Sequence, residues 1–205
     1  MSAVTFPLLG IARLRMGSDG SGVTSLVAGA GCPLRCEWCI NKKLLRDAPA
    51  ENVTAGKLLD RVIADDLYYQ ATGGGITFGG GEPLLHADFI REFRQICPSY
   101  WKITAETSLF VPRNYLAAVT DAVDLFIVDC KDMNEEIYRK YTGEDASVMK
   151  ENLDFLLSRK GCESVLVRVP LIPGYNTAED RQRSVKELES MGVQRMDLFE
   201  YVVKK

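Results

Sequence analysis

Residues 23–39 read "VTSLVAGAGCPLRCEWC". The stretch begins with a short β-prone apolar run and continues into a loop in which Cys32, Cys36 and Cys39 lie within eight residues. In parallel α/β sheets, ligands bind at the carboxyl ends of the strands. We therefore expect residues 23–28 to form the first strand of such a sheet, with reactive groups placed where the strand ends.

Strand and helix patterns alternate along the rest of the chain. Further strands are predicted at 75–78, 101–106, 125–129, 164–171 and 195–201, and helices at 54–69, 87–97, 112–123, 146–161 and 178–192. The first of these helices is expected to begin at a Thr54 cap and to place Leu59, Ile63 and Leu67 on one face. Apolar strands separated by amphipathic helices indicate parallel pairing through right-handed crossovers, and hence an α/β fold.

The number of units and the length of the chain favour an open barrel over a closed one. A closed barrel of eight units takes about 250 residues, whereas this chain has 205 residues and six predicted strands. We predict a partial, open parallel β/α barrel of about six units. It forms a single domain over residues 1–205, with an irregular segment at 1–22 and the barrel at 23–205.

The overall composition argues against several kinds of partner. The net charge is −3 and the basic residues are scattered, so the sequence predicts no positively charged surface that would bind nucleic acid. No apolar run approaches the roughly 20 residues that a membrane-spanning helix needs, and the first residues lack a secretory signal pattern. We expect a cytoplasmic protein that binds neither nucleic acid nor membrane.

Unusual residues follow several of the predicted strands. The stretch "GGGEP" (79–83) follows the second strand, "ETS" (106–108) ends the third and "DCK" (129–131) ends the fourth. Because the carboxyl ends of parallel strands meet at one edge, these residues and the three cysteines are expected to line the same mouth.

Three closely spaced cysteines indicate a metal centre. A CxxxCxxC loop can hold three irons of a 4Fe–4S cluster and leave the fourth iron open to a ligand that is not protein. A structural zinc ion needs four ligands, and here the only histidine is His86, while Cys97, Cys130 and Cys162 are isolated. A zinc site completed by a distant residue and a set of three unliganded buried thiols are the alternatives.

At this point the sequence resembles the radical S-adenosylmethionine (SAM) enzymes, and within them the glycyl-radical-enzyme activases of the pyruvate formate-lyase activating enzyme type. The resemblance spans about residues 16–201. It rests on four stretches in order: "GCPLRCEWCIN" (31–41), "GGGITFGGGEPLL" (73–85), "VDCKDMNEEIYRKYTG" (128–143) and "VLVRVPLIPGYN" (165–176). It implies that SAM binds the open iron and is cleaved to a 5'-deoxyadenosyl radical, with the protein supplying binding and orientation.

The resemblance also implies roles for residues around the cluster. Trp38 matches the aromatic residue before the third cysteine. Gly80 and Gly81 would let the backbone approach SAM closely, and Glu82 would accept from its ammonium group.

Charged residues at the other strand ends are candidate SAM contacts. Lys131 and Arg168 can donate to a carboxylate or to ribose. Glu106 and Asp129 can accept from hydroxyl or ammonium groups, or together hold a monovalent cation.

Several positions depart from the family pattern. Glu106 stands where the family usually has Asp, followed by Ser108 and Leu109 in place of an Asn-Gly turn. Ile40 replaces a histidine after the third cysteine, and Val202 replaces the histidine after Tyr201. These changes concern the substrate more than the cofactor.

The resemblance implies a glycyl radical enzyme as protein substrate and an electron donor such as flavodoxin or ferredoxin. A radical SAM enzyme acting on another peptide or on a small metabolite is the alternative, and a non-enzymatic iron–sulfur electron carrier is a third possibility.

His86 follows "GGGEPLL" at a helix start, where a histidine usually caps the helix or packs against its neighbours. Without His86 as a base, no Ser-His-Asp or Cys-His arrangement can be assembled.

Overall fold

The strands form one open sheet. A computed structural model describes residues 4–202 and shows eight strands in the order β3-β1-β2-β4-β5-β6-β7-β8. Their bounds are β1 Phe6–Met16, β2 Val23–Gly29, β3 Glu51–Val53, β4 Gly75–Gly80, β5 Lys102–Thr107, β6 Leu125–Asp129, β7 Val165–Leu171 and β8 Met196–Glu200.

Helices connect these strands. The α-helices are α1 Lys42–Asp47, α2 Ala55–Val62, α3 Asp66–Thr72, α4 Ala87–Ile96, α5 Arg113–Val119, α6 Glu135–Thr142, α7 Ser147–Lys160 and α8 Ala178–Ser190. Short 3-10 turns, η1 Ile63–Asp65, η2 Pro83–His86 and η3 Cys162–Ser164, join some of them. No helix within residues 4–202 has both the length and the apolar character that crossing a membrane would take.

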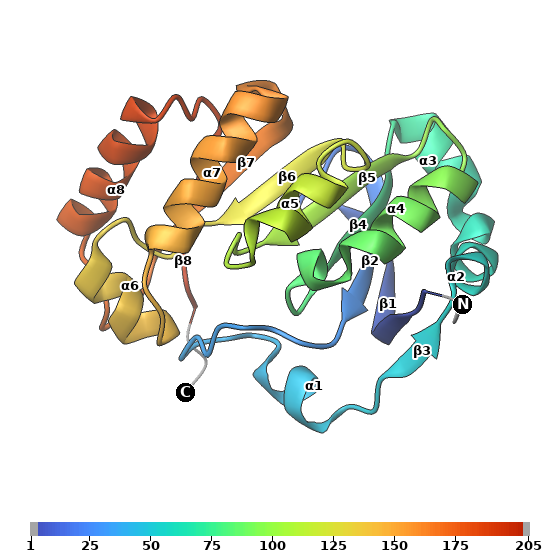
Figure 1. The fold of residues 1–205 in the computed structure, drawn as a ribbon, viewed down its shortest axis with the longest axis horizontal. Helices are drawn as coiled ribbons and strands as arrows, with labels where there is room; N and C mark the ends of the chain where they lie inside the picture. Colours follow the sequence, from blue (N-terminus) through green and yellow to red (C-terminus); the bar gives the residue numbers. More distant parts are fainter. Residues whose placement is uncertain (1–3, 203–205) are drawn as a thin grey trace.

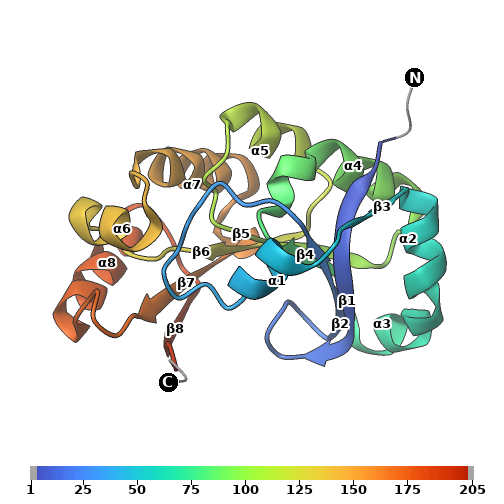
Figure 2. The same cartoon turned by 90° about the horizontal axis from the view of Figure 1, so that it is seen from below.

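The parallel part of the sheet confirms the predicted α/β fold. Strands β2, β4, β5, β6, β7 and β8 lie side by side in this order, and each pairs in parallel with the next. They are the six strands that the sequence predicted. Helices α4, α5 and α7 cover one face of this sheet, while α1 and the loop that precedes it lie beyond the carboxyl ends of the strands (Figures 1 and 2).

Side-chain alternation gives the two faces different chemistry. In β4, Ile76 and Phe78 point into the apolar core under the helices, where Phe78 packs edge-on against Phe93 at 5.6 Å. Thr77 and Gly79 point to the opposite, concave face, where Gly79 lies close to Glu106. This polar concave face is left for the functional site because the sheet does not close.

The expectation of an irregular segment over residues 1–22 is wrong for residues 6–16, which form β1. This strand pairs antiparallel with both β2 and β3, a short strand that the sequence also did not predict. The register of β1 shifts between Leu8 and Gly10 and again between Ala12 and Arg15. These irregularities interrupt the alternation of apolar and polar residues by which a strand is recognised. The predicted domain also includes residues 1–3 and 203–205, which lie outside the described range.

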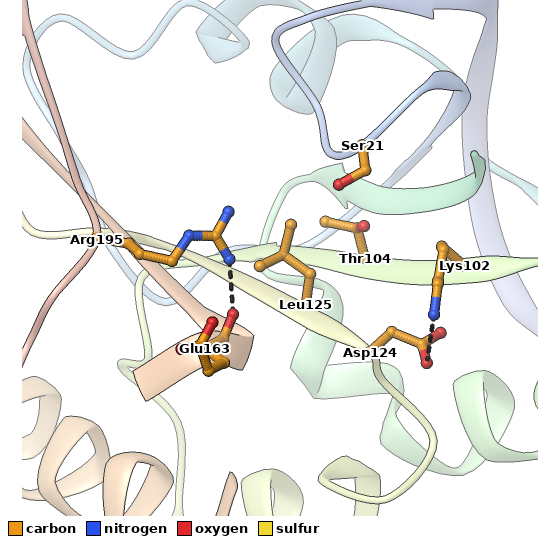
Figure 3. Close-up of a pocket in the computed structure, with 7 residues that line it drawn as sticks. All are labelled: Ser21, Lys102, Thr104, Asp124, Leu125, Glu163 and Arg195. Carbon is orange, nitrogen blue, oxygen red and sulfur yellow. Dashed lines mark hydrogen bonds and ion pairs between the residues drawn. The ribbon is translucent and has the colours of Figure 1, made fainter. Parts of the chain in front are cut away.

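Residues 17–22 form a loop that closes the amino-terminal end of the concave face. The Asp19 carbonyl accepts from the hydroxyl of Thr77, and the Ser18 carbonyl accepts from the guanidinium of Arg168. Ser21, from the same loop, lies over Leu125 in a small cavity of about 150 Å³ (Figure 3). The loop therefore forms a floor beneath the carboxyl ends of the strands.

The helical segment predicted over 54–69 begins where expected, because the Thr54 side chain accepts from the Lys57 amide at 3.4 Å. The segment is broken, however, into α2, η1 and α3. Its buried face was predicted wrongly: Ile63 and Leu67 are 43% and 74% exposed. The residues that face the core are Leu58, Val62, Asp65 and Tyr69.

Candidate active site

The carboxyl ends of the parallel strands and the cysteine loop enclose a cavity of about 970 Å³. Every residue proposed from the sequence as a cluster or cofactor contact lines this cavity: Cys32, Cys36, Trp38, Cys39, Gly80, Gly81, Glu82, Glu106, Asp129, Lys131 and Arg168. Residues separated by up to 136 positions are thus brought together by the parallel order of the strands.

The cysteine loop is anchored on both sides of its central thiol. The amide of Arg35 donates to the Thr142 carbonyl at 3.0 Å, and the amide of Glu37 donates to the Tyr141 carbonyl at 3.1 Å. Cys36 is therefore held against the carboxyl end of α6. Burial raises the pKa of the Cys36 thiol, and the nearby charge of Lys131 opposes this rise.

The donor set fits an iron–sulfur cluster. Cys32, Cys36 and Cys39 are free thiols on one loop, and all three line the cavity. No three His, Cys, Asp or Glu side chains within residues 4–202 converge on a single metal-ion position. A 4Fe–4S cube does not require such convergence, because each thiolate binds a different iron.

The glycines after β4 allow close packing against the cysteine loop. A side chain at Gly81 would place its Cβ 2.0 Å from the Gly31 carbonyl oxygen, and one at Gly80 would lie 2.8 Å from Ala28. Gly80 also has φ = +89°, and its carbonyl accepts from the side-chain amide of Asn41 at 2.8 Å. Glycine is therefore required at these two positions because the protein's own backbone, at Ala28 and Gly31, lies too close for a side chain.

Glu82 joins the ends of β4 and β5. Its carboxylate accepts from the Thr107 hydroxyl at 2.7 Å, from the Ser108 amide and hydroxyl at 2.9 and 2.6 Å, and from the Leu84 amide at 3.2 Å. Burial raises the pKa of Glu82, while the bonds from Ser108 and Thr107 oppose that rise. These four bonds tie the end of β4 to the end of β5 through the Glu82 side chain.

Leu109 adopts the backbone conformation that favours glycine, with φ = +56°. This position follows Ser108, where the family pattern has an Asn-Gly turn. The Leu109 amide donates to the Thr107 hydroxyl at 2.9 Å and its carbonyl accepts from Asn152 at 2.9 Å. The side chain is fully buried. The turn is therefore retained without glycine, because these bonds and the packing of the leucine hold it.

Arg168 holds Glu106 on the concave face. One guanidinium nitrogen donates to the Glu106 carboxylate at 2.9 Å, another donates to the Ser18 carbonyl, and Nε lies 3.9 Å from Asp197. Burial raises the pKa of Glu106, and the positive charge of Arg168 opposes that rise.

Lys131 forms the second ion pair of the cavity. Its ammonium lies 3.1 Å from the Asp129 carboxylate and donates to the Tyr201 hydroxyl at 3.0 Å. Burial lowers the pKa of Lys131, but Asp129 and Tyr201 outweigh this effect and raise it well above its ordinary value. A monovalent cation between Glu106 and Asp129 would have to share these carboxylates with Arg168 and Lys131.

Some residues around the cavity were not found from the sequence. Asn41, Tyr141 and Asp197 line it, and only Asn41 carried a signal, as the last residue of the cysteine stretch. His86 lies outside the lining: its Nε2 is 3.2 Å from the Ala30 carbonyl and its ring packs edge-on against Phe6. It therefore packs at the base of the cysteine loop, as its position at a helix start suggested.

Comparison with known proteins finds relatives that are named as activating enzymes. Two relatives are the (2S)-3-sulfopropanediol dehydratase activating enzyme of Klebsiella oxytoca, 29% identical over 77% of this chain and 69% of that protein, and the pyruvate formate-lyase 1-activating enzyme of Escherichia coli K12, 28% identical over 89% and 76%.

A similar fold is found in the crystal structure of Streptococcus suis SuiB, with a TM-score of 0.65 and 13% identity over 88% of this chain. This chain corresponds to 40% of the SuiB chain. The fold of SuiB supports the assignment of a partial barrel. The model of the Radical SAM superfamily matches residues 26–188, and the chain therefore belongs to that superfamily.

Proposed function

We propose that the cavity holds a 4Fe–4S cluster on Cys32, Cys36 and Cys39 with SAM beside it, and that the protein generates a glycyl radical on a partner enzyme. The observation that carries this proposal is the convergence of three free thiols and the charged strand-end residues on one open cavity. When bound, the reduced cluster supplies the electron that cleaves SAM to a 5'-deoxyadenosyl radical, which removes a hydrogen atom from glycine.

The residues of the chain would bind and orient SAM. Lys131 has three donors, of which Asp129 and Tyr201 take two, so its ammonium retains one donor on the cavity side. Arg168 would act mainly by holding Glu106 in place, since its own donors face Glu106 and the Ser18 carbonyl. Glu82 and Asn41 would fix the strand end and the cysteine loop relative to each other.

Exposed apolar side chains at the mouth of the cavity favour a protein substrate. Trp38, Ile40 and Val202 line the cavity and are 40%, 96% and 87% exposed. Exposed apolar residues grouped around a site are typical of protein contacts. Two of them, Ile40 and Val202, stand where the family pattern has histidine, so this mouth would fit a partner different from that of the family type.

The electron must come from a low-potential donor, for which flavodoxin and ferredoxin are the candidates. Arg35, Lys42 and Lys43 are exposed around the cysteine loop. Positive charge near the cluster would attract an acidic donor protein. The six free cysteines also fit a reducing, cytoplasmic environment.

Anaerobic reconstitution tests the cluster and the cofactor chemistry. We expect about four irons per chain, most of them lost in Cys36→Ala. The matched control is Cys162→Ala, which removes a thiol outside the cavity lining and should keep the iron. The wild-type protein, once reduced, should convert SAM to 5'-deoxyadenosine. Zinc without iron, or a cluster that survives Cys36→Ala, would contradict the proposal.

A further inference from the structure

Asp132 carries a buried carboxylate directly after the cavity residue Lys131. Asp132 is 1% exposed, and none of the ion pairs formed within residues 4–202 includes it. A buried charge is costly unless it is paired or well hydrogen-bonded. The donors that surround this carboxylate therefore show what it holds in place.

Three donors from three segments hold the Asp132 carboxylate. Its Oδ1 accepts from the Asn134 amide at 2.9 Å and from the Ser184 hydroxyl at 3.1 Å. Its Oδ2 accepts from the side-chain amide of Asn176 at 3.0 Å. Ser184 belongs to α8, and Asn176 lies in the turn between β7 and α8. The carboxylate therefore joins the segment that follows β6 to the two elements that follow β7.

The segment that carries Lys131 depends on this network. Residues 130–134 connect β6 to α6 and form no regular structure. The Cys130 amide still donates to β7 at 3.0 Å. Further along, the Met133 amide donates to the Ser184 hydroxyl at 3.0 Å, the same hydroxyl that donates to the carboxylate. The backbone on the carboxyl side of Lys131 is thus held by buried side chains instead of by strand pairing.

The same network also reaches the segment that supports Tyr201, a partner of the Lys131 ammonium. The side-chain oxygen of Asn176 accepts from the Ile172 amide at 2.6 Å and so closes the turn after β7. At the start of that turn, the Leu171 carbonyl accepts from the Tyr201 amide at 3.0 Å. The buried carboxylate is therefore linked to Lys131 through the backbone and to Tyr201 through this turn.

We infer that Asp132 is a positioning residue that fixes the Lys131 ammonium at the wall of the cavity. The consequence for SAM rests on the proposed function, in which Lys131 donates to SAM. A neutral amide cannot replace the carboxylate, because Asn has a single acceptor oxygen. In Asp132→Asn, the new NH2 group would face one of the three donors, and at least one link of the network would break.

The test measures the reactivity of Lys131 in the cluster-free protein. Lys131 is 8% exposed and ion-paired, whereas the side chain of Lys102 is 55% exposed. After treatment with limiting acetic anhydride, peptide mass spectrometry gives the labelling of Lys131 relative to that of Lys102. In Asp132→Asn this ratio should rise about tenfold, the factor that corresponds to the loss of one hydrogen bond to a charged group.

Asp124→Asn is the matched control. The Asp124 carboxylate also accepts from a backbone amide, that of Ile103 at 2.8 Å, but it lies before β6, at the opposite end of the strand. This variant should leave the labelling of Lys131 unchanged. Unchanged labelling in Asp132→Asn, or an equal rise in Asp124→Asn, would overturn the inference. If Asp132→Asn does not fold, Ser184→Ala replaces it, with an expected rise of about threefold; no rise there would overturn the inference as well.

SAM binding to the reconstituted protein separates the inference from the proposed function. Asp132→Asn should hold as much iron as the wild type, and calorimetry should show its affinity for SAM lowered about tenfold. Raised labelling of Lys131 with wild-type SAM affinity would support the inference and remove Lys131 from the proposed SAM site. Lowered affinity without raised labelling would show that Asp132 does not act through Lys131, and would overturn the inference alone.

Discussion

The ion pair between Arg168 and Glu106 should be the strongest charge interaction on the floor of the cavity, and Arg168→Met tests this. Both side chains are largely buried, 16% and 18% exposed, and their bond is 2.9 Å long. A hydrogen bond between charged groups contributes about 1.5–3 kcal/mol, and removing one partner of a fully buried pair costs about 3–5 kcal/mol. Because part of each side chain reaches solvent, we expect about 2–3 kcal/mol for Arg168→Met.

A double-mutant cycle separates the pair from its surroundings. Glu106→Gln should cost about 1–2 kcal/mol, because the amide still accepts from the guanidinium but the charge is lost. The double variant should then be less destabilised than the sum of the two single variants by at least about 1 kcal/mol. The free energy of unfolding of the cluster-free proteins in urea at neutral pH measures each corner of the cycle.

The exposed pair of Arg159 and Asp121 provides the control. Its nitrogen and oxygen are 3.9 Å apart, and the side chains are 62% and 85% exposed. Exposed pairs couple by less than about 1 kcal/mol, so this cycle should be close to additive. If the effects of the Arg168 and Glu106 variants were also additive to within about 0.5 kcal/mol, the two charges would not stabilise each other. The ion pair described here would then be wrong.

Three further predictions concern single residues. Lys131→Met should retain the cluster but weaken SAM binding by about 1.5–3 kcal/mol; calorimetry that found wild-type affinity would remove Lys131 from the SAM site. Burial raises the pKa of Glu82 above its ordinary value of 4.5, so its contribution to stability is complete below pH 4.5 and declines as pH rises through the raised pKa. In urea titrations of cluster-free protein, wild type should therefore lose stability relative to Glu82→Gln as pH rises through that range, and a constant difference would show that the folded carboxyl titrates normally. Thr54→Ala should cost about 0.5–1 kcal/mol through loss of the α2 cap, and an unchanged urea midpoint would mean that the bond to Lys57 contributes nothing.

The parallel strands and the site residues could be predicted because their signals are local. Strands such as 125–129 are almost continuous in apolar residues, and the helix that follows Ala146 ends at Gly161, which the structure shows as its cap. The convergence of the strand-end residues then followed from the parallel topology alone. The sequence could therefore identify the cysteines and the strand-end residues that line the cavity, although not Tyr141 or Asp197.

The buried face of the segment 54–69 could not be predicted, because it depends on a residue distant in sequence. Asp65 is buried there since Arg13 and Ser25 donate to its carboxylate. Arg13 belongs to β1, a strand that the sequence did not predict because its register is irregular. When this partner is not known, a charged residue such as Asp65 is expected to face solvent. The apolar side chains of Ile63 and Leu67 are then expected to face the core.

The roles of the site residues depend on contacts that spacing does not reveal. Glu82 was expected to accept from SAM, and the structure adds bonds from Thr107 and Ser108, which follow it by 25 and 26 positions. Arg168 donates a hydrogen bond to Glu106, which lies 62 positions away in the sequence. The sequence identified these groups as polar residues that need partners, whereas the partners themselves are set by the register of adjacent strands.

The most direct test of the account is the fate of a glycine α-hydrogen. The reduced, reconstituted protein would be incubated with SAM and a candidate glycyl radical enzyme, labelled with deuterium at the glycine α-carbon. We predict that 5'-deoxyadenosine acquires the deuterium and that the partner shows a glycyl radical doublet in electron paramagnetic resonance. If 5'-deoxyadenosine forms without label from any glycine, while a small metabolite transfers its own deuterium, the activase assignment is contradicted.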